Sequence, residues 1–476
     1  MIDVVETMAG LGDCVYTRTV VRNLLAQGRE VYVRTCWPQV FVDLPVKCLP
    51  FPTELRTQRR NVERGWAWAD YPSGSNRIHP SYSWGQGLSL PRALASKVGV
   101  PAEGDFSFSP PWSASKGKKP LAIVIPPTVR TEWPNVARPC DPCYMQQLIT
   151  EHRGFDWVEV SDLDPPKEVL FGQPLVGVRH AGDLSTEQLI GLLATADVIV
   201  TGVGYGLPLG IALRVPTLCL FGGDIPERLL VEDWMIGAPY ASLQPHPFCE
   251  CGIRGRHTER GVCNRDLWPH EVERAFRQVA FKWDTRRDYG HWPVHINGQY
   301  NKDYFENYRR LEQTEMGAAI NAFRVDWVKQ HFGEQPMVDI GVGSCQFVKA
   351  THALGADINP ASVQELQRLG RYVDLETLAS TGVLTFWDSL EHIHEPETLL
   401  SVAKVGVAVS MPIYRDREHA LSSRHFKPHE HIHYWTHESF ASYMWDQGFM
   451  MMNFSDHETE LGRDGIRTYA FARREE

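Results

Sequence analysis

The chain has 476 residues, of which 43% are hydrophobic and 22% are charged. This length exceeds the roughly 250–300 residues at which a single core stops growing, so we expect more than one domain. The net charge of -10 argues against non-specific binding along nucleic acid, which needs clustered basic side chains. No apolar run approaches the ~20 residues that span a bilayer, which excludes a membrane-spanning helix.

The first predicted unit begins with an apolar strand over residues 2–6, followed by a glycine-rich segment over residues 10–13. A helix and a strand over residues 31–33 complete a β-α-β unit. Between residues 54 and 117, many Pro, Trp, Arg and Ser residues interrupt the pattern, and we expect only a helix over residues 91–98.

The same alternation continues through the rest of the chain. The second unit has strands over 121–125, 157–160, 197–200 and 217–221, helices over 144–152 and 186–194, and a glycine-rich turn over 202–206. The third unit has a helix over 314–330 and strands over 338–340, 355–358, 384–387 and 405–410. Such alternation predicts an α/β fold with parallel sheets covered by helices. We expect two Rossmann-like lobes, a surface-packed connector and a third Rossmann-like domain, over residues 1–117, 118–283, 284–308 and 309–476.

A motif at the start of the third domain indicates a cofactor site. The strand over residues 338–340 runs into Asp339, Gly341 and Gly343, where a side chain at a glycine position would block close approach of a cofactor to the backbone. Asp357 ends the next predicted strand, where its carboxylate can accept hydrogen bonds from both hydroxyls of a ribose.

This region, over about residues 300–476, resembles the class I S-adenosylmethionine-dependent methyltransferases. Residues 388–393 are similar to the family's D-x-L-E-H-I segment. The resemblance implies that Gly341 and Gly343 face the methionine part of S-adenosylmethionine and that Asp357 faces the ribose, with Asp339 as a further cofactor-binding residue. It places Asp388, Ser389 and Leu390 at the rim of the pocket. Cys345 departs from the pattern, because the family often has a further glycine there.

The histidine-rich segment after residue 424 has three interpretations. Alternation of His429, His431 and His433 would put three imidazoles on one face of a strand, as a metal site requires. Similar segments in the family line the acceptor pocket without a metal, which makes Glu430 and His431 our preferred candidates for acceptor binding or acid–base catalysis, and structural packing is the third interpretation. His392 is a further candidate base, or else a helix-cap or core histidine. We therefore expect no metal.

Two glycine-rich loops in the first two lobes point to a bound anion. Gly10 and Gly12 lie between the first strand and its helix, with Asp13 directly after them, and Gly204, Tyr205 and Gly206 repeat this arrangement in the second lobe. Such loops aim backbone N–H groups and a helix N-terminus at phosphate. Two facing lobes of this kind suit a nucleotide-sugar held between them.

The first loop resembles the G-x-G-D of heptosyltransferase-like GT-B glycosyltransferases, and the resemblance covers about residues 1–280. It implies that Asp13 is the general base on an acceptor hydroxyl, that Arg130 holds phosphate and that no metal is needed. Asp13 as the N-cap of its helix, and Arg130 in a surface salt bridge, are the alternatives. The chain departs from the family at Pro208, Leu209 and Gly210, where these enzymes often carry a histidine.

We interpret the chain as a bifunctional transferase that uses a nucleotide-sugar and S-adenosylmethionine, acting in sequence on one small-molecule or glycan acceptor. One alternative is a methyltransferase whose first two lobes are a degenerate binding platform. The other is a DNA-modifying enzyme that contacts phosphates through Arg56, Arg59, Arg60 and Arg64. The strand-like start of the chain and the lack of a long apolar run lead us to expect a cytoplasmic protein. The tandem resembles proteins encoded by bacteriophages and bacteria. A structural zinc site is left open at Cys249, Cys251, His257 and Cys263.

Overall fold

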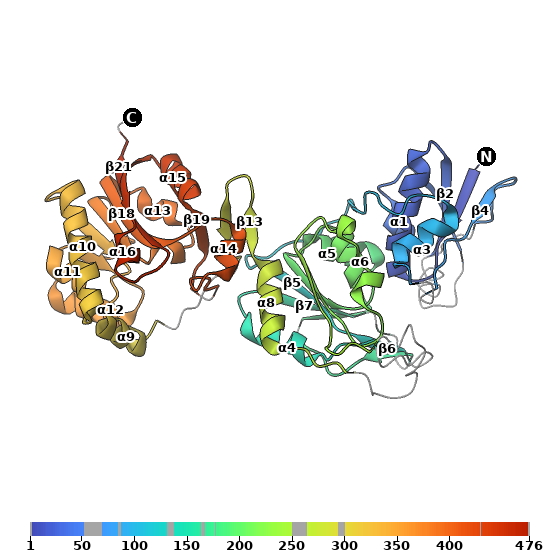
Figure 1. Cartoon of the computed structure of the whole chain (residues 1–476), viewed down its shortest axis with the longest axis horizontal. Coiled ribbons are helices and arrows are strands. Elements are labelled where there is room, and N and C mark those ends of the chain that lie inside the picture. Colours follow the sequence, from blue (N-terminus) through green and yellow to red (C-terminus); the bar gives the residue numbers. More distant parts are fainter. Residues whose placement is uncertain are drawn as a thin grey trace. The chain divides into compact units, whose positions relative to one another are not determined.

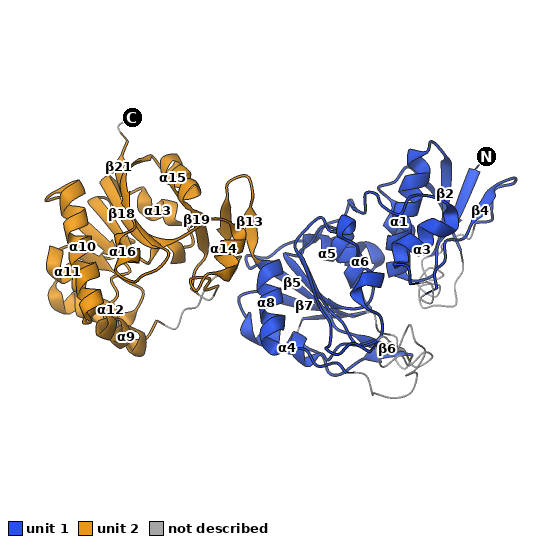
Figure 2. Cartoon of the chain, in the orientation of Figure 1, with its two compact units in different colours: residues 1–280 blue, residues 281–476 orange. Residues whose placement is uncertain are grey.

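The computed structural model describes most of the chain (Figure 1), namely residues 2–51, 69–83, 87–130, 138–161, 163, 167–176, 178–249, 264–293, 300–428 and 430–474. Two compact units divide it, residues 1–280 and residues 281–476 (Figure 2). Among the described residues, no helix combines the length and apolar character needed to cross a membrane.

The first sheet of unit 1 has four parallel strands in the order β3-β2-β1-β4. They are β1 (Ile2–Glu6), β2 (Glu30–Thr35), β3 (Lys47–Pro50) and β4 (Asn76–Ile78). Helix α1 (Leu11–Ala26) links β1 to β2 and contacts α3 (Leu90–Val98). The apolar centre of β1 is fully buried, as expected for a parallel strand covered on both faces. The predicted strands and the predicted helix over 91–98 are confirmed.

The second sheet of unit 1 has six parallel strands, in the order β12-β11-β10-β5-β7-β9. They are β5 (Leu121–Ile125), β7 (Asp156–Ser161), β9 (Arg179–Ala181), β10 (Val198–Gly202), β11 (Thr217–Leu220) and β12 (Tyr240–Leu243). The helices are α4 (Cys143–Glu151), α5 (Thr186–Thr195), α6 (Gly206–Ala212) and α8 (Pro269–Ala280), with 3-10 turns η1 (Pro38–Phe41), η3 (Glu227–Leu229) and η4 (Asp233–Met235) elsewhere in unit 1. A short antiparallel pair, β6 (Thr128–Arg130) and β8 (Glu168–Leu170), follows β5.

The two sheets of unit 1 share one hydrophobic core, which includes Val5 and Leu11 of the first lobe together with Ile123 and Ile199 of the second. Gly12 lies at their junction, because a Cβ there would be 3.4 Å from both the Tyr205 Cα and the Pro208 Cγ. The glycine-rich loops of the two lobes therefore lie in close contact with each other at Gly12.

Unit 2 contains one mixed sheet with a parallel centre. Strands β16 (Leu354–Ala356), β15 (Met337–Ile340), β17 (Thr381–Trp387) and β18 (Ala403–Tyr414) are parallel neighbours, and β21 (Ile466–Arg473) and β20 (Phe449–Ser455) follow as antiparallel strands. The helices are α9 (Lys302–Glu312), α10 (Glu315–Phe332), α11 (Gln346–Thr351), α12 (Pro360–Leu369), α13 (Pro396–Leu400), α14 (Arg417–Ser422), α15 (His437–Asp446) and α16 (His457–Glu460), with η5 (Leu390–His392). The sheets of both units confirm the predicted Rossmann-like α/β class.

The segment that we expected to be a connector, residues 284–308, is largely part of unit 2. Strands β13 (Lys282–Asp284) and β14 (Tyr289–His291) form a hairpin, and β14 pairs with β19 (His433–Thr436), which continues the sheet from the end of β18. The expected boundary at residue 309 falls inside α9. The sequence pattern did not reveal these elements because their aromatic residues make ring contacts, such as Tyr289 with Trp435, and form no apolar stripe.

Candidate functional sites

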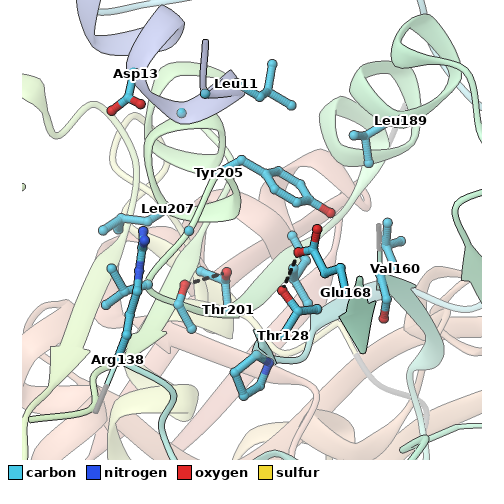
Figure 3. A pocket seen from close by; sticks show the side chains of 18 of the residues that line it. Leu11, Asp13, Thr128, Arg138, Val160, Glu168, Leu189, Thr201, Tyr205 and Leu207 are labelled. Atoms are coloured by element: carbon cyan, nitrogen blue, oxygen red, sulfur yellow. Dashed lines mark hydrogen bonds between the residues drawn. The ribbon is translucent and has the colours of Figure 1, made fainter. Parts of the chain in front are cut away.

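A cavity of about 730 Å³ opens in unit 1 where strands of both sheets end (Figure 3). Residues 8–13 after β1, 125–129 after β5 and 201–205 at the end of β10 line it. Ligands of open α/β sheets bind outside the carboxyl ends of the strands, and this volume is that of a small-molecule site.

Asp13 is a carboxyl group in the wall of the cavity whose pKa is raised. Burial raises its pKa to about 6, against the opposing effects of the Arg138 guanidinium and of a hydrogen bond from Tyr82. Figure 3 shows the Arg138 side chain extending toward Asp13 at the start of α1. A carboxylate with a pKa close to the working pH is well matched to removing a proton from a hydroxyl.

The helix cap is not formed by Asp13. Gly10 is the N-cap residue of α1, without a side-chain hydrogen bond, and Asp13 is the third residue of the helix. A Cβ at Gly10 would collide with the Asp13 Oδ2, so this glycine leaves room for the carboxylate. The N-cap alternative for Asp13 is therefore wrong, and its side chain does not cap the helix.

The second glycine loop combines an open position with a packed one. Gly204 has no atom within 4 Å of the place where a Cβ would be, whereas a Cβ at Gly206 would be 2.6 Å from the Ile125 Cδ1. Tyr205 and Glu168 point into the same part of the cavity, and Glu168 accepts a hydrogen bond of 2.7 Å from the Thr128 hydroxyl (Figure 3). Gly204 thus leaves the cavity wall flat enough for close approach of a ligand.

The cation of the cavity is Arg138, which the sequence reasoning missed. Arg130 is the last residue of β6, in register with Glu168, and its side chain lies outside the described part of the structure. No sequence signal distinguished Arg138, since the loop between β6 and α4 follows no repeating pattern.

The glycine turn of unit 2 follows β15, as predicted. Gly341 and Gly343 have φ values of 77° and 55°, in the left-handed region that favours glycine. A Cβ at Gly341 would be 2.7 Å from the Ser389 Cβ, and Ser389 donates a 2.6 Å hydrogen bond to the Ile340 carbonyl. Cys345 also has a positive φ, of 66°, so the position where the family often has glycine adopts a backbone that glycine prefers.

Asp357 lies directly after β16, beside this turn. Its Oδ1 accepts a 2.7 Å hydrogen bond from the Asn359 N–H, and burial raises its pKa against hydrogen bonds from the backbone N–H groups of Asn359 and Gly343. The next residue, Ile358, is apolar yet 78% exposed. An acid that can bind hydroxyls and an exposed apolar side chain that a flat ring can cover therefore lie side by side.

Asp339 and Leu390 support the turn from below rather than facing a ligand. Asp339 is a buried residue of β15; burial raises its pKa to about 7, and the Thr385 hydroxyl donates a 2.7 Å hydrogen bond to it. Leu390 is fully buried in the core of unit 2.

Asp388 is held in a buried ion network. Its Oδ2 is 2.9 Å from the Arg324 Nη2, and its Oδ1 is 2.8 Å from the Arg463 Nη2. The same two arginines bind Glu458, whose side chain is fully buried. Burial would raise the pKa of Asp388, but Arg463 and Arg324 hold it well below its usual range. Asp388 has a φ of 58°, so the network fixes a strained turn next to Ser389.

Glu391, His392 and His431 meet in a buried cluster. The Glu391 Oε1 is 3.8 Å from the His392 Nε2 and 4.0 Å from the His431 Nε2. Burial lowers the pKa of His392 to about 4 and that of His431 well below its usual value. Imidazoles of such low pKa are weak general bases near neutral pH. Glu430 lies at the surface, with its Oε2 3.2 Å from the Lys427 Nζ.

Alternation could have placed three histidines on one strand face, but the two that are described, His431 and His433, do not share such a face. His433 opens β19, where its Nε2 is 2.7 Å from the Ile393 carbonyl oxygen and its Nδ1 bonds to the Tyr289 hydroxyl. His431 precedes the strand and faces Glu391 instead. His429 lies outside the described residues. A metal site built from these three imidazoles is therefore contradicted by the placement of the two that are described.

One face of α9 and Tyr300, two residues before it, add groups that the sequence reasoning missed. Tyr300, Tyr304 and Tyr308 contact one another in series, edge-on and then tilted, with ring centroids 5.0 and 4.8 Å apart. The Tyr300 hydroxyl is 3.3 Å from the His392 Nδ1, and Glu312 at the helix end bonds to the Ser344 hydroxyl beside Gly343. This face connects the glycine turn with the buried cluster, and a spacing of four residues between the tyrosines was the signal available in the sequence.

No family model and no curated protein matches this sequence. Solved structures of similar fold belong to several kinds of protein, among them a [4+2]-cyclase. They include heptosyltransferases and S-adenosylmethionine-dependent methyltransferases, the two families that the motifs resemble.

Three of these structures illustrate the two families. The iron-containing dodecameric glycosyltransferase TibC from enterotoxigenic E. coli has 13% identity over 49% of this chain, with a TM-score of 0.37, and this chain spans 61% of its length. E. coli ADP-heptose LPS heptosyltransferase II has 13% identity over 59% of this chain and 98% of its own, with a TM-score of 0.35. The 1,6-didemethyltoxoflavin-N1-methyltransferase of Burkholderia thailandensis has 15% identity over 36% of this chain and 86% of its own, with a TM-score of 0.28.

Two sets of expected contacts fall outside the described residues. The arginines considered for DNA binding, Arg56, Arg59, Arg60 and Arg64, all lie there. Of the zinc candidates, Cys249 alone is described, as a partly buried free thiol, and Cys251, His257 and Cys263 are not.

Proposed function

We propose that the chain is a transferase with two sites, a glycosyl-transfer site in unit 1 and a methyl-transfer site in unit 2. The position and raised pKa of Asp13 support the first assignment. This residue lies in a cavity of small-molecule size, with a pKa of about 6 and with glycine loops from both lobes around it. In this proposal Asp13 takes the proton of an acceptor hydroxyl, and the Gly204 loop and Arg138 hold the phosphates of a nucleotide-sugar.

The glycine turn with Asp357 carries the second assignment. Gly341 and Gly343 leave the backbone open at the end of β15, and Asp357 and Ile358 offer a hydroxyl acceptor and an apolar surface next to it. These features fit the methionine, ribose and adenine parts of S-adenosylmethionine, which when bound supplies an activated methyl group. Such chemistry asks the protein chiefly to position the acceptor.

Titration calorimetry of the full chain with S-adenosylmethionine and with a panel of nucleotide-sugars tests both assignments. Asp357→Asn should weaken S-adenosylmethionine binding by about 10- to 100-fold, since it removes charge-assisted hydrogen bonds, and leave nucleotide-sugar binding unchanged. Gly204→Leu should do the reverse, because its side chain would enter the open cavity. Each variant is the control for the other. A wild-type chain that binds no S-adenosylmethionine contradicts the methyl-transfer site.

Replacing Arg138 tests the electrostatics of the first site. The guanidinium lowers the pKa of Asp13, so Arg138→Gln should raise that pKa further and move the acidic limb of the pH–rate profile for sugar transfer to higher pH. We expect a loss of about 3- to 10-fold near pH 6, from a displacement of up to one pKa unit. Arg138→Lys keeps the charge and should keep the limb close to that of the wild type. An acidic limb that Arg138→Gln leaves in place would contradict this role.

A further inference from the structure

Three metal-ligating side chains from two separate loops meet at the cluster of Glu391, His392 and His431. One ligand atom from each lies within 4.8 Å of those of the other two. The Ile432 N–H donates a 2.8 Å hydrogen bond to the Glu391 carbonyl, which ties the two loops together. The backbones of the two loops are thus held next to each other at the cluster.

The cluster contains buried polar atoms that lack hydrogen bonds. Glu391 is 2% exposed and His431 is 4% exposed. Within the described part of the chain, the two carboxylate oxygens of Glu391 have no hydrogen-bond partner, and the Nδ1 of His431 has none either. Native proteins rarely leave such atoms unpaired, and an ordered water or a bound ion is the usual partner. The Glu391 carboxylate therefore has room for a partner that the described residues do not supply.

The outer contact of His392 suits ligation. The Tyr300 hydroxyl, 3.3 Å from the His392 Nδ1, leaves the Nε2 of that ring facing Glu391. An outer partner of this kind orients ligating histidines in known metal sites.

A second cluster shows the contrast. Glu151, His152 and Glu273 also lie close together, but His152 Nε2 is 2.8 Å from the Glu273 Oε2, and Arg277 pairs with the same glutamate. Those charges already compensate one another, so that cluster needs no ion.

We propose that Glu391, His392 and His431 ligate one divalent transition-metal ion of the zinc, manganese or iron(II) class. Two imidazoles with one carboxylate favour this class over magnesium or calcium, which prefer oxygen ligands. An ion at the centre would lie roughly 2.5 Å from each ligand atom, so shifts of a few tenths of an ångström reach the ~2.1 Å of zinc–nitrogen bonds. With three protein ligands, the ion keeps a position open, and if the methyl-transfer site is as proposed, an acceptor oxygen can take it.

The test is direct metal binding by the full chain, which requires neither proposed substrate. After treatment with a chelator and dialysis, the chain is titrated with Co²⁺, followed by its visible absorption bands and by elemental analysis. We expect one equivalent with the spectrum of nitrogen and oxygen ligands, and binding about 100-fold weaker in His431→Gln and in Glu391→Gln. Glutamine is nearly isosteric with glutamate, so we expect Glu391→Gln to fold.

Two controls separate this site from other sources of metal. His457→Gln alters a half-exposed histidine of unit 2 paired with Glu460, and should bind as the wild type does. Cys249→Ser with Cys251→Ser should also leave the site intact. The proposal is overturned if the wild type takes up no Co²⁺, or if both ligand variants bind it with wild-type affinity. It is also overturned if the bound ion shows thiolate absorption bands and is lost only in the cysteine variant. Absence of S-adenosylmethionine binding with intact metal uptake would contradict the methyl-transfer site alone.

Discussion

Asp13→Asn is expected to lower sugar transfer by about 100- to 10,000-fold while making unit 1 more stable. The rate falls because an amide cannot accept the proton of the acceptor hydroxyl. Stability rises because the folded chain holds the pKa of Asp13 at about 6, above its ordinary 3.8, so ionising it opposes folding. The penalty grows as pH rises from about 4 to 6 and stays constant above, where it is on the order of 2–3 kcal/mol.

Single-turnover transfer assays and urea unfolding at pH 4.5 and pH 8 measure the two effects separately. The stability difference between variant and wild type should be small at pH 4.5 and near its full size at pH 8. Tyr82 can still donate its hydrogen bond to the asparagine oxygen, which keeps the packing comparable. Full transfer activity in Asp13→Asn would instead favour a unit 1 that serves as a binding platform for another catalyst.

Arg324→Met is expected to destabilise unit 2 by about 3–5 kcal/mol, the range for a buried charge that loses its partner. Arg324 is 2.8 Å from Glu458 and 2.9 Å from Asp388, and the Glu458 side chain is fully buried. Removal of Arg324 leaves Arg463 to balance both carboxylates. Hydrogen exchange of peptides from residues 381–414, which contain β17 and β18, reports the loss in unit 2 separately from unit 1.

The double variant Arg324→Met with Glu458→Leu is the matched control. It removes one charge of each sign and keeps the pair of Asp388 with Arg463, so much of the lost stability should return. The arginines lower the pKa of Asp388 and of Glu458 despite burial. At a pH above the ordinary pKa values of these carboxyl groups, the network therefore stabilises unit 2, and this stabilisation is lost as pH falls through the acid range. A single variant as stable as the wild type would show that the network contributes little.

Much of the framework followed from local sequence patterns. Continuous apolar runs such as Leu121–Ile125 and Val198–Gly202 predicted buried parallel strands, and both are fully buried. Gly341 and Gly343 could be assigned a turn because the left-handed backbone there excludes most other residues. These features depend on neighbours in sequence, which is why periodicity and glycine spacing reveal them.

Long-range contacts account for what was missed or misplaced. Nothing around Arg138 in the sequence shows that its guanidinium acts on Asp13, and Glu391 meets His431 only because two loops cross. Asp388 was expected at the rim of a pocket, but both its oxygens bind arginines that are distant in sequence. The aromatic residues of α9 lacked an apolar stripe, so a helix was interpreted as a connector.

The sequence by itself determined the α/β class, the two glycine loops around Asp13 and Gly204, and the turn that precedes Asp357. These follow from steric limits on the backbone and from burial of apolar strands, which act over a few residues. Only the tertiary structure decided the ionisation of Asp13, the arginines around Asp388 and the cluster of Glu391 with two histidines. Burial and charge–charge distance set those properties, and both depend on segments that folding brings together.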